Sequence, residues 1–180
     1  MGVSYPAIER WLFAEGVLQQ TIEGIRAIGQ SEKEAGAFWL GKREQTAHVS
    51  FVVLPHGIGV EESCGRWVVS AEVFGAITRW AKPRDLCLLG VAHSHIRGVP
   101  PVLSWTDRNL GVRVPGSIAA VIGNAGEDAD YRRWGWYVFE GEEYRRFTRE
   151  EITNRISIDS SGKFEVWMAD SKGVHVWETR

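Results

Sequence analysis

The chain has 180 residues, of which 44% are hydrophobic and 24% are charged, a balance typical of one globular domain. Its formal net charge of −2 gives no overall attraction to nucleic acid or to an anionic membrane, so we expect neither as a partner. We also expect no leader and no membrane-spanning segment. Cys64 and Cys87 lack C-X-X-C spacing, which favours reduced thiols and a cytoplasmic location.

The first half of the chain changes from helical to strand periodicity. Apolar residues recur at helical spacing from Val17 and stop before Gly29, as in a helix that ends at a glycine. After that point the apolar runs become short and alternate with polar residues. The elements expected here are a helix over 17–28, strands over 37–41, 47–54 and 67–69, and a helix from the cap Ser70 to about Ala81.

The second half contains a buried strand over 86–92, which follows the breakers of 82–85. The later elements expected are a short helix from Ser104, strands over 117–122, 134–139 and 144–147, a helix from Thr148 to about Ile156, and hairpin strands over 163–169 and 173–177. This mixed order predicts an α/β (α+β) fold, in which helices pack on a curved mixed sheet. We expect a single domain over 1–180, with a core at about 15–150 and a C-terminal β-hairpin extension over 156–178.

Two histidines stand at the carboxyl end of the 86–92 strand. His93 and His95 are two residues apart, so their side chains point to the same face of the strand. Ser104 and Asp107 lie three apart at the start of a short helix and face the same way. Together they offer two imidazoles, a carboxylate and a hydroxyl, the ligand set of a hydrolytic zinc site with one position left for water. Ser104 and Asp107 also match a capping box, and the two interpretations are compatible.

A hydrolytic zinc site needs a general base to take the proton of the bound water. The candidate lies where an acidic residue precedes the apolar strand that closes on Gly41. Spacing alone does not choose between Glu34 and Glu32, and a solvated glutamate at a helix-to-strand junction is the alternative.

The combination resembles the JAB/MPN family, in its catalytic branch with the JAMM motif, over about residues 15–150. That branch has a glutamate before the first core strand, with glycines three and seven residues later, and the resemblance therefore selects Glu34 through Gly41. It departs from the pattern at Ala37, where glycine is usual, and at Ile96, where proline is common. The segment between the second histidine and the serine holds eight residues, 96–103, where seven is usual.

The resemblance implies a cytidine-deaminase-like MPN core and one Zn²⁺ per chain. It implies that His93, His95 and Asp107 bind the zinc, that Glu34 is the general acid/base, and that Ser104 stabilises the oxyanion. The activity implied is that of an isopeptidase or peptidase that cleaves the amide bond after the C-terminal tail of a ubiquitin-like protein, either to process a precursor or to release a conjugate.

A compact chain of this kind resembles prokaryotic members that act in a ubiquitin-like conjugation pathway, with the activating and conjugating enzymes as further partners. Two alternatives stay open: a metal-free scaffold with the same fold, and a zinc hydrolase of a small-molecule or sulfur-carrier amide.

Two other features are less specific. The arginines at positions 132, 133, 145, 146 and 149 form a basic cluster, which is either a solvated face or a groove for an acidic partner. Trp105 lies inside the Ser104–Asp107 motif, and we expect it to point toward the sheet.

Overall fold

The computed structural model describes residues 7–30 and 32–177. Their strands are β1 (Arg10–Ala14), β2 (Gly36–Lys42), β3 (Thr46–Pro55), β4 (Val60–Ser63), β5 (Arg66–Val69), β6 (Cys87–Ser94), β7 (Ile118–Ile122), β8 (Gly135–Phe139), β9 (Tyr144–Arg146), β10 (Ile156–Asp159), β11 (Glu165–Asp170) and β12 (Gly173–Val176). The helices are α1 (Val17–Gly29), α2 (Ala71–Ala81), α3 (Trp105–Leu110) and α4 (Arg149–Arg155), with short 3-10 helices η1 (Lys82–Arg84), η2 (Asn124–Gly126) and η3 (Tyr131–Arg133).

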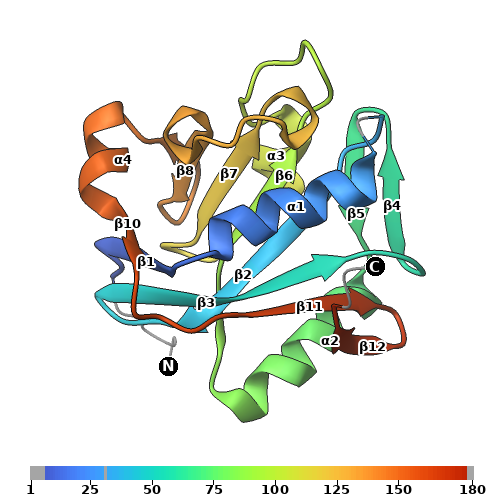
Figure 1. Ribbon diagram of the computed structural model, residues 1–180, viewed down its shortest axis with the longest axis horizontal. Helices are drawn as coiled ribbons and strands as arrows, with labels where there is room; N and C mark the ends of the chain where they lie inside the picture. The colour runs from blue at the N-terminus through green and yellow to red at the C-terminus, as the bar shows by residue number, and fades with distance from the viewer. Residues whose placement is uncertain (1–6, 31, 178–180) are drawn as a thin grey trace.

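Ten of these strands form one curved, mixed sheet, and β4 pairs with β5 in a separate hairpin (Figure 1). The main path of the sheet runs β10-β1-β3-β2-β6-β7-β8-β9. β3 is long enough to pair with two strands on its outer edge: its first half pairs with β1 and its second half with β11. The C-terminal hairpin of β11 and β12 is therefore a continuation of the sheet edge.

Strand β2 separates two hydrophobic cores because its side chains alternate between the faces of the sheet. Ala37 and Trp39 pack in the core that contains the buried side chains of α1, whereas Phe38 and Leu40 pack in the core under α2. Figure 1 shows α1 crossing one face of the sheet, with α2 placed beside β11 and β12. Burial on both faces explains why the β2 sequence is almost entirely apolar.

A β-bulge at the end of β2 accounts for the glycine of the sequence motif. The register between β2 and β3 shifts between Leu40 and Gly41. A Cβ atom on Gly41 would lie 1.8 Å from the backbone oxygen of His48, so only glycine fits there. Ala37 stands at the first glycine position of the motif, four residues before Gly41. Its methyl group is buried in the core, which shows that alanine is accommodated there.

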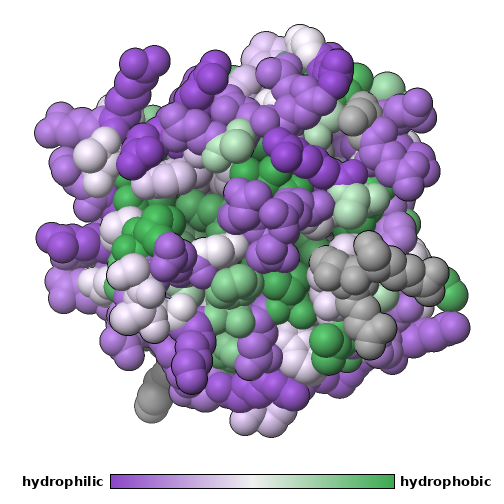
Figure 2. Space-filling view, in the orientation of Figure 1, coloured by the Kyte–Doolittle hydropathy of each residue, from purple (hydrophilic) through white to green (hydrophobic). Residues whose placement is uncertain are grey.

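The visible surface is largely hydrophilic (Figure 2), as expected when most large apolar side chains are buried in the two cores. In Figure 2, hydrophilic side chains cover most of the visible face, and apolar side chains show between them. Within the described residues, no helix has the length and apolar character needed to cross a membrane.

The fold class predicted from the sequence is confirmed: a curved mixed sheet flanked by helices. Three strands were not predicted, namely β1, β4 and β10. β10 follows α4 directly and pairs in parallel with β1, almost the whole chain away in sequence. β1 and β10 become strands through partners far away in sequence, whereas β4 pairs with its neighbour β5; in each case four or five residues alone carry little periodicity.

Candidate metal centre

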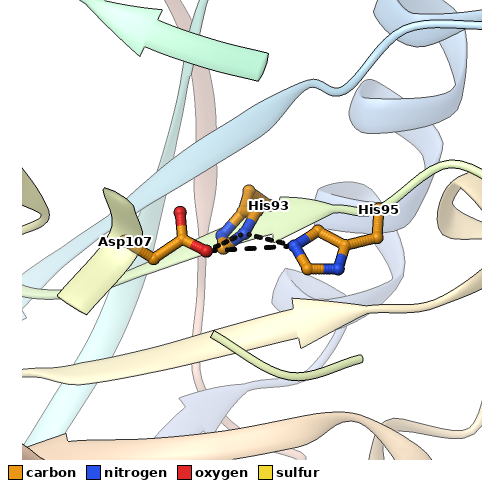
Figure 3. A group of neighbouring side chains, drawn as sticks. All are labelled: His93, His95 and Asp107. Carbon is orange, nitrogen blue, oxygen red and sulfur yellow. Dashed lines mark hydrogen bonds and ion pairs between the residues drawn. The ribbon is translucent and has the colours of Figure 1, made fainter. Parts of the chain in front are cut away.

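His93 and His95 lie at the carboxyl end of β6, where their rings point in the same direction (Figure 3). β6 is a central strand, with Gly36 of β2 opposite His93 on one side and Val121 of β7 on the other. Both histidines are 5% exposed. The structure thus confirms that these two residues share a face at the end of a buried strand.

Asp107 reaches the same point from helix α3. Ser104 is the N-cap of that helix, and its Oγ accepts a hydrogen bond from the backbone N–H of Asp107 at 3.1 Å. In return, Asp107 Oδ2 accepts the backbone N–H of Ser104 at 2.7 Å. The same Oδ2 lies 3.4 Å from His93 Nε2 and 3.9 Å from His95 Nε2. One carboxylate therefore both completes the capping box and contacts the two histidines; Figure 3 shows its contacts with the histidines.

Two of the three separations in this cluster match those around a small divalent ion, and the third, 3.9 Å from His95 Nε2 to Asp107 Oδ2, is a few tenths of an ångström longer. The two Nε2 atoms are 3.3 Å apart, and all three ligand atoms lie within 4.8 Å of one another. Bonds of about 2.0–2.2 Å in a tetrahedron place neighbouring ligand atoms roughly 3.3–3.6 Å apart. Since two imidazoles and one carboxylate also leave a coordination position open, His93, His95 and Asp107 could hold a metal ion.

Neighbouring groups orient both rings. His95 Nδ1 lies 2.9 Å from the backbone oxygen of Pro100. A carbonyl oxygen only accepts, so Nδ1 carries the hydrogen and Nε2 faces the site. The ring of Trp67 in β5 lies nearly parallel to that of His93, at 12° and 6.5 Å between centroids. The sequence does not predict the contacts of Pro100 and Trp67 with the histidine rings, because no local motif accompanies residues whose role is to position another side chain.

Glu34 lies beside this cluster, two residues before β2. Gly36 pairs with His93, so the same antiparallel register continues to place Glu34 next to His95. Ser94 Oγ and the backbone of Ala35 hold the two segments together at 3.3–3.4 Å. Glu34 is 8% exposed, whereas Glu32 lies exposed in the preceding turn. Of the two glutamates that the spacing left open, only Glu34 is buried against the histidines.

The electrostatics of the cluster follow from burial and mutual attraction. Burial raises the pKa of the Glu34 carboxyl, and the His95 and His93 imidazoles oppose this shift only in part. Burial also acts to raise the pKa of Asp107, but hydrogen bonds from the two histidines outweigh it and hold that pKa well below its usual range. Asp107 is thus ionised and Glu34 is biased toward holding a proton, so the two carboxyl groups are suited to different tasks.

The loop 96–103, one residue longer than the motif leads one to expect, packs back against the site. It supplies the Pro100 oxygen, and Leu103 at its end is buried, with its backbone N–H donating to Tyr137 Oη at 3.3 Å. The prediction for Trp105 is wrong: its side chain is 74% exposed, and none of the residues of α3 is buried. In this short helix it is Arg108 that reaches the sheet, by donating to the backbone oxygen of Tyr144 at 3.4 Å, whereas Trp105 points to solvent.

No family model matches the chain, and no curated protein matches it. Among solved structures, protein DSY2949 from Desulfitobacterium hafniense is similar over 83% of this chain and 93% of its own length, with 14% identity and a TM-score of 0.59. AF2198, a JAB1/MPN domain protein from Archaeoglobus fulgidus, aligns over 82% of this chain and 97% of its own, with 15% identity and a TM-score of 0.42. At this identity the likeness to DSY2949 shows the fold alone.

Proposed function

We propose that this chain is a zinc-dependent JAMM-type metallopeptidase of the JAB/MPN family. The observation that carries the proposal is the convergence of His93, His95 and Asp107 on one point, with buried Glu34 beside them. Their order along the chain and their placement, with the histidines at a strand end and the aspartate in the first turn of a helix, match the resemblance found in the sequence. The donor set supports the proposal, because two imidazoles and one carboxylate with an open position are ligands that catalytic zinc sites use.

A zinc ion bound there would polarise a carbonyl group and lower the pKa of a bound water to about 7. Glu34 is placed to accept a proton at its carboxylate and to pass it to the leaving amine. Its burial keeps this proton transfer away from bulk water and raises its pKa above the ordinary value. A raised pKa favours a carboxyl that both accepts and releases a proton, as the two halves of amide hydrolysis require.

Ser104 is the proposed oxyanion partner. Its oxygen accepts the Asp107 N–H, and a hydroxyl that accepts a hydrogen bond also has one hydrogen to donate. The capping box fixes the position of this hydroxyl relative to the Asp107 carboxylate. Ser104 can therefore donate to developing negative charge without ligating the ion.

The proposed substrate is the amide bond after the C-terminal tail of a ubiquitin-like protein, in a precursor or a conjugate, within a bacterial cytoplasmic conjugation pathway. Exposed apolar side chains near the site favour a protein substrate: Val99 and Val102 on the loop after His95, and Trp105 and Leu110 on α3. An extended tail that threads between such side chains would offer main-chain groups for pairing.

Zinc content tests the ligand set. The purified protein should contain about one zinc per chain, and the Asp107→Ala variant should contain almost none, since two imidazoles alone leave a weak site. Elemental analysis of both proteins after dialysis measures this. Absence of zinc in the wild-type protein, even after zinc is supplied, would favour a metal-free scaffold instead.

Glu34→Gln tests the proton transfer. This variant should retain its zinc and lose cleavage by a factor on the order of a hundred or more, because an amide cannot accept the proton. The assay uses a ubiquitin-like protein whose Gly-Gly tail carries a fluorogenic amide. Glu32→Gln is the matched control, since it removes the same charge two residues away at an exposed position. Retained cleavage in Glu34→Gln would rule out the mechanism, and zinc binding without cleavage of any tail would favour a small-molecule amide substrate.

A further inference from the structure

Four arginines line an open cleft formed by η3, β9 and α4, none of which contributes to the metal centre. They are Arg132 and Arg133 of η3, Arg146 of β9 and Arg149 of α4. The cleft has a volume of about 680 Å³, within the range of small-molecule sites. Figure 2 shows strongly hydrophilic side chains at the upper left, where Figure 1 places α4.

The floor of the cleft belongs to the hydrophobic core. Trp134, Phe147 and Ile152 line it, and all three are buried. The indole of Trp134 donates to the backbone oxygen of Asp128 at 2.8 Å, which fixes the segment that carries η3. The base of the cleft is therefore rigid, while the arginine side chains above it are exposed and free to adjust to a ligand.

The charges in the cleft are not balanced. Asp130 is the single acidic residue among those that line it, and it pairs with Arg132 at 3.7 Å. Arg133 pairs with Asp128 at 3.5 Å. Arg146 and Arg149 have no ion pair with a carboxylate in the part of the chain that the structure describes. Arg146 instead lies over the ring of Tyr137, at 5.8 Å from its centroid.

Two of the neighbouring acidic groups are engaged elsewhere, and a third, Glu150, is exposed beside Arg149 at the start of α4. Glu140 and Glu151 both bind Arg145, at 2.7 and 3.0 Å, and Glu151 also lies 3.7 Å from Arg155. Arg146 and Arg149 thus line the cleft without a carboxylate partner in the described residues, with the Arg146 guanidinium over the Tyr137 ring at the edge of the sheet, in a chain whose overall charge is negative. Like charges gathered around a concave surface favour a bound anion.

We propose that this cleft binds a small ligand that carries two or more phosphate groups. The planar guanidinium group donates two parallel hydrogen bonds to phosphate oxygens, so several arginines in one cleft match a phosphate chain better than isolated carboxylates. The apolar floor leaves room for an uncharged part of the ligand. This site is independent of the proposed peptidase activity, because no lining residue belongs to the metal centre.

Calorimetric titration with sodium tripolyphosphate at low salt tests the site. The wild-type protein should bind one tripolyphosphate per chain, and Arg146→Ala/Arg149→Ala should weaken binding by roughly tenfold or more, since two charge-assisted contacts are lost. Arg79→Ala/Lys163→Ala is the matched control. Both of its residues are exposed and outside the cleft, and it removes the same two charges. It should bind within about twofold of the wild type.

Further titrations separate the alternatives. Binding should persist in Asp107→Ala, which shows that the probe is not held at the metal centre. The affinity of Arg146→Lys/Arg149→Lys for tripolyphosphate should fall between those of the wild-type protein and the alanine variant, because lysine keeps the positive charge but cannot donate two parallel hydrogen bonds. ATP that binds more tightly than tripolyphosphate would identify a nucleotide as the ligand class, and equal affinity would identify the phosphate chain itself.

Four results would overturn the proposal: no binding by the wild-type protein, equal weakening in the Arg79/Lys163 control, loss of binding in Asp107→Ala, or tighter binding of a hexaglutamate peptide than of tripolyphosphate. The last result would assign the cleft to an acidic protein segment. Circular dichroism of each variant checks that it is folded before titration.

Discussion

Helices α3 and α4 both begin with a capping box, and the two boxes have nearly the same dimensions. In α3, Ser104 N donates to Asp107 at 2.7 Å, and Asp107 N donates to Ser104 at 3.1 Å. In α4, Thr148 N donates to Glu151 at 2.9 Å, and Glu151 N donates to Thr148 at 3.1 Å. As local structure the two are equivalent.

Their surroundings differ. The Glu151 carboxylate meets two arginines, Arg145 and Arg155, and forms ion pairs on the protein surface. The Asp107 carboxylate meets two buried imidazoles at the end of β6. The acidic residue of the α4 box is therefore neutralised by arginines, whereas that of the α3 box joins two imidazoles with which it could hold a metal ion.

The two helices also differ in how they are anchored. α4 buries Ile152 in the core, whereas α3 buries none of its own residues and exposes Trp105 and Leu110. The position of α3 thus depends on its cap, on the loop 96–103 and on Arg108, which donates to the backbone oxygens of Leu103 and Tyr144. A capping box in the sequence predicts where a helix begins. Whether its acidic residue also takes part in a site depends on which distant elements pack beside it.

Removing the two cap hydroxyls should have different consequences. Thr148→Ala should cost about 1 kcal/mol of unfolding free energy and leave cleavage of the fluorogenic tail unchanged. Ser104→Ala should lower cleavage by a factor on the order of a hundred, because it also removes the proposed oxyanion donor. Urea unfolding and initial cleavage rates of both variants measure the contrast.

The zinc content of Ser104→Ala separates loss of the proposed oxyanion donor from displacement of Asp107 by loss of the helix cap. Retained zinc with slow cleavage would assign the loss to the hydroxyl donor, as expected. If Thr148→Ala slowed cleavage as much as Ser104→Ala, the activity would depend on general stability, and the proposed role of Ser104 would be wrong.

Much of the metal centre could be predicted because its parts are local patterns. The apolar run before His93 predicts a buried strand, alternation places His95 on the same face, and three-residue spacing joins Ser104 to Asp107. The choice of Glu34 over Glu32 needed either the family resemblance or the structure, because charge and spacing are nearly the same for both.

What the sequence does not predict depends on contacts between distant segments. Trp67 reaches His93 only because the β4–β5 hairpin folds over the end of β2, where a Cβ atom on Gly36 would clash with the Trp67 ring. β10 is a strand because β1 lies beside it. The basic cluster could be located from the sequence, but the structure is needed to show which acidic residue pairs with which arginine. Arg145 pairs with Glu140 and Glu151, whereas Arg132 and Arg133 pair with Asp130 and Asp128.

The smallest expected difference between the two boxes concerns the pH dependence of stability. The hydrogen bond from Arg145, together with the cap, lowers the pKa of Glu151 below its ordinary value of 4.5. A lowered pKa in the folded state stabilises the protein above pH 4.5, and this contribution is lost as the pH falls through the folded-state value. Because the pair is near the surface, it should amount to roughly half a kcal/mol.

Urea unfolding of the wild-type protein and of Glu151→Gln, from pH 7 down to pH 3, measures this contribution as a difference. The wild-type protein should be more stable at pH 7, and the gap should shrink below the ordinary pKa of a glutamate, since protonated glutamate and glutamine then interact alike with Arg145. Asp107 has a lowered pKa as well, but it is present in both proteins and cancels from the difference. A gap that stays constant across this range would mean that the α4 box acts through its cap hydrogen bonds alone, without a contribution from charge.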